Sequence, residues 1–457
     1  METPTTEPPA PPRRLLGVLF LGTLLAALDI AVVGPALPAL RETFALSERA
    51  VAWTFTAFVL ANLAGLPVMA SLADRVGRRR VYLTDIAVFA AGTVVVVLAP
   101  SFGVLLAGRV VQGLGASGIF PVASAVIGDA YPPETRGRAV GLLGAVFGVA
   151  FLVGPAVGGI VLAFASWRWL FALSLPLAAV VFVLSARTVP ESRAAVPRPF
   201  DALGAALLTT LLVSLVVGLT GLDASALAAS VARPAVWGPL ALAGVLVPAL
   251  VAVERRAAAP MIRPGLIARR PVQVACALAV GAGLVEATFV LLSAYAVAEF
   301  GVAKSQASYL LLPLVAGVAV GSPVAGRLLD RVGARPVVTV GAVLVAAGMA
   351  TIAAGPGLAL HVAGTVVLGL GLSGILGSSL SYILLNEAGA DERAVAQGLS
   401  TVFISVGQLV GAAVLAALAA SAATPAEGYR SGFALVAGAS VLLVLLARAL
   451  PARREAA

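Results

Sequence analysis

Three ionisable side chains stand within long apolar runs of this sequence and could do chemistry there. Arg109 lies in AGRVVQGLGASGI, Asp29 in LDIAVVGPALPAL and Glu286 in GLVEATFVLL. Charged groups are costly in an apolar setting, so residues of this kind face the protein interior and are functional candidates. A carboxyl group removed from water holds its proton more tightly, whereas a nearby arginine charge favours its release. We therefore predict a proton-coupling set of Asp29, Arg109 and Glu286. The alternative is structural, with each group hydrogen-bonded for helix packing.

The segment around Arg109 occurs twice in the chain. At an offset of 256 positions, residues 363–375 read AGTVVLGLGLSGI, which is identical at ten of thirteen positions and has Thr365 in place of Arg109. A second pair, ASLADRVGRRR at 70–80 and GRLLDRVGARP at 326–336, has the same offset. A duplicated chain keeps its packing residues in both copies and can keep its chemistry in one. We infer an internal repeat.

The composition places these runs in a membrane. The chain is 60% hydrophobic and only 11% charged, and its mean hydropathy is +1.06, whereas about 25% of residues are charged in soluble domains. A transmembrane β-barrel would instead show alternating segments of about ten residues. Apolar runs of about 18 residues or more predict transmembrane helices. We count fourteen, near 15–40, 48–70, 81–99, 103–127, 138–163, 169–187, 202–222, 236–254, 272–298, 305–326, 337–355, 358–385, 394–419 and 431–449.

The repeat organises these fourteen helices into an all-α polytopic membrane protein with two pseudo-symmetric six-helix bundles. We predict an N-terminal bundle at 15–187 and its copy at 272–449. Two additional central helices lie within 188–271, together with their flanking loops. Residues 1–14 form a disordered cytoplasmic N-terminus, and residues 450–457 form a cytoplasmic tail.

The charge distribution explains the net charge of +9 without a nucleic acid partner. If the N-terminus is cytoplasmic, the inner segments carry 23 basic residues and the outer loops six. This asymmetry follows the positive-inside rule and predicts that both termini are cytoplasmic. The chain has one cysteine, Cys276, and one histidine, His361, so we predict neither a metal site nor a histidine-based catalytic centre. The only lysine, Lys304, lies in no phosphate-binding loop. A gradient must then supply the energy, without a cofactor.

Four motifs, in order along the chain, resemble those of major facilitator superfamily transporters, specifically the fourteen-helix drug:proton antiporter branch. They are LDIAVVGPALP in the first helix, ASLADRVGRRR after the second, AGRVVQGLGASG in the fourth and AFLVGPAVGG in the fifth. The resemblance extends from about Leu15 to Leu450. The sequence departs from these motifs at Ala31, Gly34, Pro35, Ala70 and Ala150.

The resemblance implies a proton-coupled secondary active exporter of small amphipathic or hydrophobic compounds such as drugs and antibiotics, not an enzyme. It implies a role in proton coupling for Arg109, and an antiporter motif at Gly154, Pro155, Gly158 and Gly159 that seals the bundle against proton leak. Ordinary close packing of small residues is the alternative for that motif. The expected setting is a bacterial cell membrane, with a small-molecule substrate, protons and lipid as partners. The expected state is a monomer.

Two further groups of residues complete the predicted site. A conformational latch on the inner face, for which topology anchoring is the alternative, comprises Asp74, Arg75, Gly77, Arg78, Asp129, Asp330 and Arg331. Substrate-cavity candidates, for which packing or lipid contact is the alternative, are Trp53, Phe58, Gln112, Phe120, Phe289, Tyr295, Tyr382, Phe403 and Gln408. Asp85, near the inner end of the third helix, is expected to be structural or interfacial.

Other functions stay open at the level of sequence. Within transport, the alternatives are an exporter dedicated to one endogenous metabolite or self-made antibiotic, and an importer. Gly154 and Pro155 disfavour import, through the family resemblance alone. A membrane-embedded enzyme or a receptor is a different class, and catalysis would then rest on carboxylates.

Overall fold

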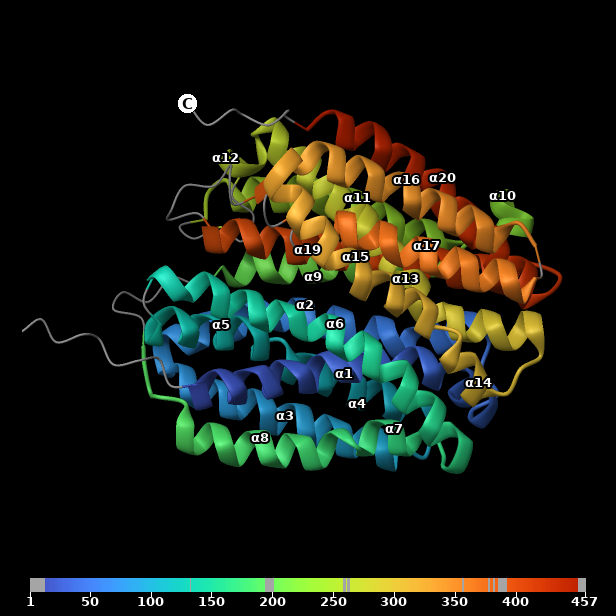
Figure 1. Ribbon diagram of the computed structural model, residues 1–457. Coiled ribbons are helices and arrows are strands. Elements are labelled where there is room, and N and C mark those ends of the chain that lie inside the picture. Colours follow the sequence, from blue (N-terminus) through green and yellow to red (C-terminus); the bar gives the residue numbers. More distant parts are fainter. Residues whose placement is uncertain are drawn as a thin grey trace, which may run out of the picture.

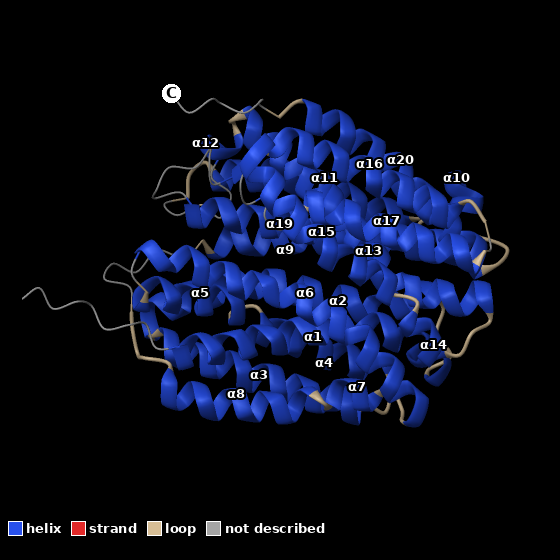
Figure 2. Ribbon diagram, viewed as in Figure 1, coloured by secondary structure: helices blue, strands red, loops and turns tan. Residues whose placement is uncertain are grey.

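The computed structural model describes residues 13–131, 133–193, 201–257, 260, 264–355, 357–376, 379–380, 383–384 and 393–450. Helices dominate this part of the chain, which contains no strand (Figure 2). An apolar membrane interior offers no hydrogen-bond partners to the backbone, and a helix satisfies its own N–H and C=O groups internally. The structure confirms the predicted all-helical class.

Eight helices form the N-terminal bundle, and their axes run roughly side by side (Figure 1). They are α1 (Arg13–Thr43), α2 (Glu48–Val76), α3 (Arg78–Leu98), α4 (Phe102–Ala116), α5 (Ile119–Ala130), α6 (Pro133–Phe164), α7 (Arg168–Ala172) and α8 (Ser174–Thr188). The fourth predicted span is thus two helices, α4 and α5, because Pro121 cannot donate a hydrogen bond to the carbonyl group of Ser117.

The C-terminal bundle packs against this first group (Figure 1). It comprises α13 (Arg270–Phe300), α14 (Lys304–Tyr309), α15 (Leu312–Val332), α16 (Ala334–Ala353), α17 (Leu358–Ile375), α19 (Arg393–Ser421) and α20 (Pro425–Arg448). Between the bundles in sequence lie α9 (Ala202–Thr220), the 3-10 helix η1 (Ala224–Ala226), α10 (Leu227–Val231), α11 (Pro234–Glu254) and α12 (Pro264–Ile267). Helix α9 packs on α11 and also contacts α2 and α19, one helix from each bundle.

Thirteen helical spans in the described part of the chain are long and apolar enough to cross a membrane, and some of them, such as Phe102–Ala130, comprise two consecutive helices. The remaining predicted span, 138–163, coincides with α6, a 32-residue helix. Several side chains of α6 are not described, and its described apolar stretch is the shorter Val153–Phe164. The predicted count of fourteen therefore holds approximately.

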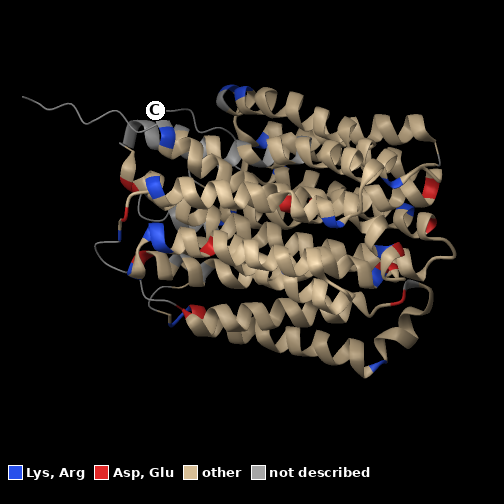
Figure 3. Ribbon diagram, turned by 90° about the horizontal axis from the view of Figure 1, so that it is seen from below, with Lys and Arg blue, Asp and Glu red and all other residues tan. Residues whose placement is uncertain are grey.

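Charged residues gather at the two ends of the bundle, with few between them (Figure 3). We call the end where α1 finishes and α2 begins the α1–α2 end, and the opposite one the α2–α3 end. At the first, the Ser47 side chain accepts a hydrogen bond from the N–H of Ala50 and caps α2. At the second, Gly77 turns the chain from α2 into α3 at a φ of 123°, a conformation that favours glycine.

Candidate functional site

Asp29 and Arg109, predicted to act together, form an ion pair inside the N-terminal bundle. Arg109 Nη1 on α4 donates to Asp29 Oδ2 on α1 at 2.5 Å. Both side chains are fully shielded from solvent. An ion pair removed from water loses the hydration of both charges, so it persists only when further hydrogen bonds surround it.

Those hydrogen bonds come from α4 itself and from the two neighbouring helices α2 and α3. Gln112 Nε2 donates to Asp29 Oδ1 at 3.0 Å and to Thr93 Oγ1 on α3 at 2.9 Å. Its Oε1 accepts from Arg109 Nη1 at 2.9 Å, and Arg109 Nε donates to the carbonyl oxygen of Thr54 on α2 at 3.0 Å. We call this set of Asp29, Thr54, Thr93, Arg109 and Gln112 the arginine network. It links helices α1, α2, α3 and α4.

Aromatic rings cover the guanidinium group of Arg109. Its Cζ atom lies 4.4 Å from the ring centre of Phe58 and 5.6 Å from that of Phe171. A cation over a ring face is attracted by the ring quadrupole, and the attraction grows when water is excluded. Phe58 therefore holds the arginine in place instead of lining an open cavity.

Glu286, the third predicted coupling residue, lies apart from the arginine network, in the C-terminal bundle. Its Oε2 on α13 accepts a hydrogen bond from Gln408 Nε2 on α19 at 2.7 Å. Among the described arginines and lysines, none forms an ion pair with Glu286. The N-terminal carboxylate is thus neutralised by a cation, whereas its C-terminal counterpart is paired with a neutral amide.

The second copy of the repeated segment has lost the arginine network. Thr365 replaces Arg109, and its hydroxyl donates to the carbonyl oxygens of His361 and Val362 on its own helix, both at 2.9 Å. Leu368, which replaces Gln112, is fully buried. The packing of the repeat is retained in both copies, while its charge is confined to one.

The glycine motif of α6 packs closely against α1 and α14. A Cβ at Gly154 would lie 2.5 Å from the Cβ of Ala31, and one at Gly158 would lie 2.6 Å from the Cβ of Pro35. Gly159 presses on the ring of Tyr309 in α14, where an added Cβ would lie 2.5 Å from the ring carbons. The motif therefore brings α6 into contact with both bundles.

Gly154→Val should destabilise the protein by about 1–3 kcal/mol, because the new side chain overlaps Ala31 and must push α6 away from α1. Thermal unfolding in detergent measures the loss. Gly244→Val is the matched control, since Gly244 lies on the spanning helix α11 and an added Cβ there meets nothing within 4 Å. Equal effects of the two substitutions would contradict the packing role.

Three of the predicted latch residues meet at the α2–α3 end. Arg78 Nη1 pairs with Asp129 and donates to the carbonyl oxygen of Ala125 at 2.8 Å, so it ties the start of α3 to α5. Its Nη2 lies 3.8 Å from Asp74 Oδ1. Arg75 is exposed. The corresponding turn of the second copy has Gly333 at a φ of 81° and an exposed Arg331, whereas the side chain of Asp330 lies outside the described part.

The predicted cavity residues divide into two groups. Trp53, Phe120, Phe289, Phe403 and Gln408 are partly exposed. Phe58, Gln112 and Tyr295 are enclosed by protein in this conformation. Tyr382 lies outside the described residues.

Tyr295 belongs to an aromatic cluster at the α1–α2 end. Its ring centre lies 5.2 Å from that of Phe433, 5.8 Å from that of His361 and 6.4 Å from that of Tyr429. This cluster fills the C-terminal bundle beside the contacts that join the two bundles. Tyr295 is therefore a packing residue, and the sequence alone gave no sign of these partners.

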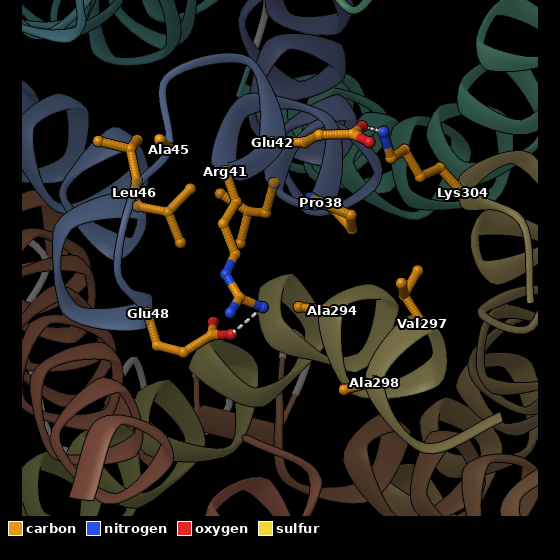
Figure 4. A pocket seen from close by; sticks show the side chains of 12 residues that line it. Pro38, Arg41, Glu42, Ala45, Leu46, Glu48, Ala294, Val297, Ala298 and Lys304 are labelled. Carbon is orange, nitrogen blue, oxygen red and sulfur yellow. Dashed lines mark ion pairs between the residues drawn. The ribbon is translucent and has the colours of Figure 1, made fainter. Parts of the chain in front are cut away.

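Polar contacts join the two bundles at the α1–α2 end (Figure 4). Glu48 on α2 is 5% exposed, pairs with Arg41 at 2.5 Å and accepts a hydrogen bond from the hydroxyl of Tyr429 on α20. Glu42 on α1 pairs with Lys304 on α14. Together with apolar residues of α1, α2 and α13, these four charged groups line a pocket of about 410 Å³. This pocket lies at one end of the molecule and contains none of the predicted cavity residues.

Tyr429→Phe should loosen this end of the molecule at a cost of about 1–3 kcal/mol, since it leaves a buried carboxylate oxygen without its donor. Labelling of Ala298→Cys, in a Cys276→Ala background, by a membrane-impermeant thiol reagent should become several-fold faster. Tyr295→Phe is the control, because its hydroxyl makes no hydrogen bond with any described residue. Unchanged labelling would show that the hydroxyl does not hold the bundles together.

Sequence reasoning missed several residues on which these sites depend. Thr54 contributes only a backbone carbonyl, which any residue type supplies. Thr93 is a small polar residue in an apolar helix and carries no motif. Glu48 and Tyr429 are 381 positions apart, and nothing in the sequence connects them.

Comparisons with known proteins agree with this architecture. A family model described as Major Facilitator Superfamily matches residues 19–285 and 274–457. The Multidrug resistance protein B homolog of Mycobacterium tuberculosis is 29% identical over 411 residues, covering 89% of this chain and 75% of that protein. The Tetracenomycin C resistance and export protein of Streptomyces glaucescens is 29% identical over 435 residues, covering 92% and 78%.

Solved structures share the fold. The xylose transporter XylE from E. coli superposes with a TM-score of 0.65 at 16% identity, covering 94% of this chain and 96% of that one. The nucleoside transporter NupG superposes with a TM-score of 0.68 at 13% identity, covering 96% and 100%.

Proposed function

This chain belongs to the Major Facilitator Superfamily, and from that premise we propose that it exports small amphipathic or hydrophobic compounds in exchange for protons. The protein is a membrane transporter and not an enzyme. In the proposed mechanism, the two bundles rock around a central cavity and open it to each side of the plasma membrane in turn. The proton gradient is the energy source, the functional unit is a monomer, and fourteen spanning helices would place it in the drug:proton antiporter branch.

The observation that carries this proposal is the arginine network. A carboxylate buried beside an arginine can exist in two states, one ion-paired and one protonated, and the arginine is left without its partner in the second. Because the network joins α1, α2, α3 and α4, a change of protonation at Asp29 would alter the packing of four helices at once. That is the link between a proton and a conformational change that an antiporter needs.

We propose that the α2–α3 end is cytoplasmic, which follows from the excess of arginine there. The polar contacts between the bundles at the α1–α2 end would then close the outer side. The ion pairs of Arg78 with Asp74 and Asp129 would brace the inner side of the N-terminal bundle. Transport requires that the outer contacts break in each cycle.

Uptake of a fluorescent lipophilic cation into inverted membrane vesicles tests the proposal. We expect uptake that depends on an imposed proton gradient and stops when a protonophore collapses it. Vesicles with Asp29→Asn protein, inserted at matched levels, are the control and should show no gradient-driven uptake. Wild-type uptake that persists without any gradient would overturn the proton coupling.

A dedicated exporter of one metabolite or self-made antibiotic is the second candidate. The likeness to a relative named for tetracenomycin C resistance and export favours it. Gradient-driven uptake of a single aromatic antibiotic, with none of a panel of unrelated cations, would select this candidate over a broad drug exporter.

A further inference from the structure

Another carboxyl group is buried in the N-terminal bundle, outside the arginine network and away from Glu48. Asp85 on α3 has no solvent exposure, and neither of its side-chain oxygens takes part in a hydrogen bond with a described residue. From the sequence we expect Asp85 to be structural or interfacial, and the structure encloses it in protein. Its carboxyl group lies directly against Gly118, where an added Cβ would overlap Oδ2.

Gly118 belongs to the two-residue turn that separates α4 from α5. Helix α4 carries Arg109 and Gln112 on one side of this turn, and α5 carries Asp129 on the other. Gly115 packs equally closely on the backbone of α3, where an added Cβ would lie 2.7 Å from the carbonyl oxygen of Asp85. The Asp85 carboxyl group therefore contacts the α4–α5 turn, which connects the helix of the arginine network to the helix that carries Asp129.

No cation faces Asp85 among the described residues. The titratable group that interacts with it is Tyr82, one turn away on α3, whose hydroxyl is also buried without a hydrogen bond. Of the other helices packed on α3, α4 contributes Arg109, which is engaged with Asp29, and α5 contributes Asp129, which is engaged with Arg78. Helix α2 contributes Asp74 and Arg75 at the α2–α3 end, and α8 contributes Arg187 near its own end. Helix α7 contributes Arg168, which donates to the carbonyl oxygens of Val97 and Ala99 at the opposite end of α3.

An ionised carboxylate in such a position would be costly, because it would have neither a counter-charge nor a donor. We propose that Asp85 is a second proton-binding group of the transporter, covered by the α4–α5 turn and released to water when that turn moves. In that step its O–H bond breaks, the proton passes to water, and the carboxylate becomes hydrated. The inference rests on the proposed proton-coupled transport, but its first test does not.

Infrared spectroscopy of the purified protein in lipid bilayers follows the carbonyl stretch of protonated carboxylic acids. We expect the wild type to show, at neutral pH, an acid band that Asp85→Asn removes and Tyr82→Phe retains. The band should disappear reversibly as the pH is raised from about 5 to about 9. Deprotonation shifts the population away from the protonated state in which the α4–α5 turn covers Asp85. A wild type without this band, or a band that never titrates, would overturn the proposal even if no substrate were known.

The second measurement is the number of protons exchanged per substrate cation in reconstituted vesicles. Asp85→Asn should transport the cation while the ratio falls by one proton, and Asp85→Glu should restore it. An unchanged ratio in Asp85→Asn would make Asp85 a structural neutral acid. Failure of the proposed function is distinguishable, because it abolishes wild-type cation uptake and leaves the infrared titration intact.

Discussion

Arg109→Ala should abolish gradient-driven uptake and destabilise the protein by about 3–5 kcal/mol, because it leaves the buried Asp29 carboxylate without a counter-charge. Asp29 would keep only the amide hydrogen bond from Gln112, and Phe58 would face an empty space where the guanidinium lay. Denaturant unfolding of the purified protein measures the loss of stability, and vesicle uptake measures the loss of transport. Both losses should be present at every pH at which the wild type is active.

The matched variant removes both charges together. Asp29→Asn combined with Arg109→Gln leaves no uncompensated buried charge, which is the main cost of removing one partner of a buried ion pair. We expect the double variant to regain most of the lost stability while its uptake stays at the level of empty vesicles. Recovered transport in the double variant would show that the pair is structural.

The sequence could single out the charged residues that stand in apolar runs, but it could not say which of them would be neighbours. Asp29, Arg109 and Glu286 stood out because a charge in an apolar run is costly wherever the run folds. That argument is local, so it could not tell that Arg109 pairs with Asp29 and that Glu286 stays apart. The spatial assignment depends on how helices α1, α4 and α13 are rotated about their axes, which hydropathy alone does not define.

The repeat predicted the architecture well for a related physical reason. Duplicated small residues such as Gly113 and Gly369 sit at close helix contacts in both bundles, where a Cβ would clash with backbone atoms. Packing of this kind is recorded in the sequence as a pattern. Contacts between the bundles are not recorded in this way, because they use scattered residues such as Glu42 and Lys304.

The cavity residues illustrate the same limit. Aromatic rings suit flat or cationic substrates, so the sequence makes Phe58 and Tyr295 candidates for a cavity wall. The sequence gives the ring but not its surroundings, and the structure fills those surroundings with Arg109 in one case and with Phe433 and His361 in the other. Whether an aromatic residue lines a cavity is decided by its neighbours across the bundle.

Glu286→Gln should reduce uptake of a monovalent lipophilic cation by about 10- to 100-fold, a change of about 1.4–2.8 kcal/mol. Glu286 is partly exposed and carries no described ion-pair partner. An uncompensated carboxylate in such a setting attracts a cation at 4 Å by about 4 kcal/mol before desolvation costs. Uptake of a neutral substrate of similar size should change little. Competition between the two substrates in the same vesicles measures the selectivity directly.

The fold should tolerate this substitution, because a glutamine amide oxygen can still accept the hydrogen bond from Gln408. Gln408→Leu is the complementary variant, since it removes the hydrogen bond and keeps the charge, and it should retain the preference for cations. Equal losses of cationic and neutral transport in Glu286→Gln would argue against charge recognition. If Glu286→Gln lost all gradient-driven uptake while Asp29→Asn retained it, Glu286 would be the coupling carboxylate and the arginine network a structural element.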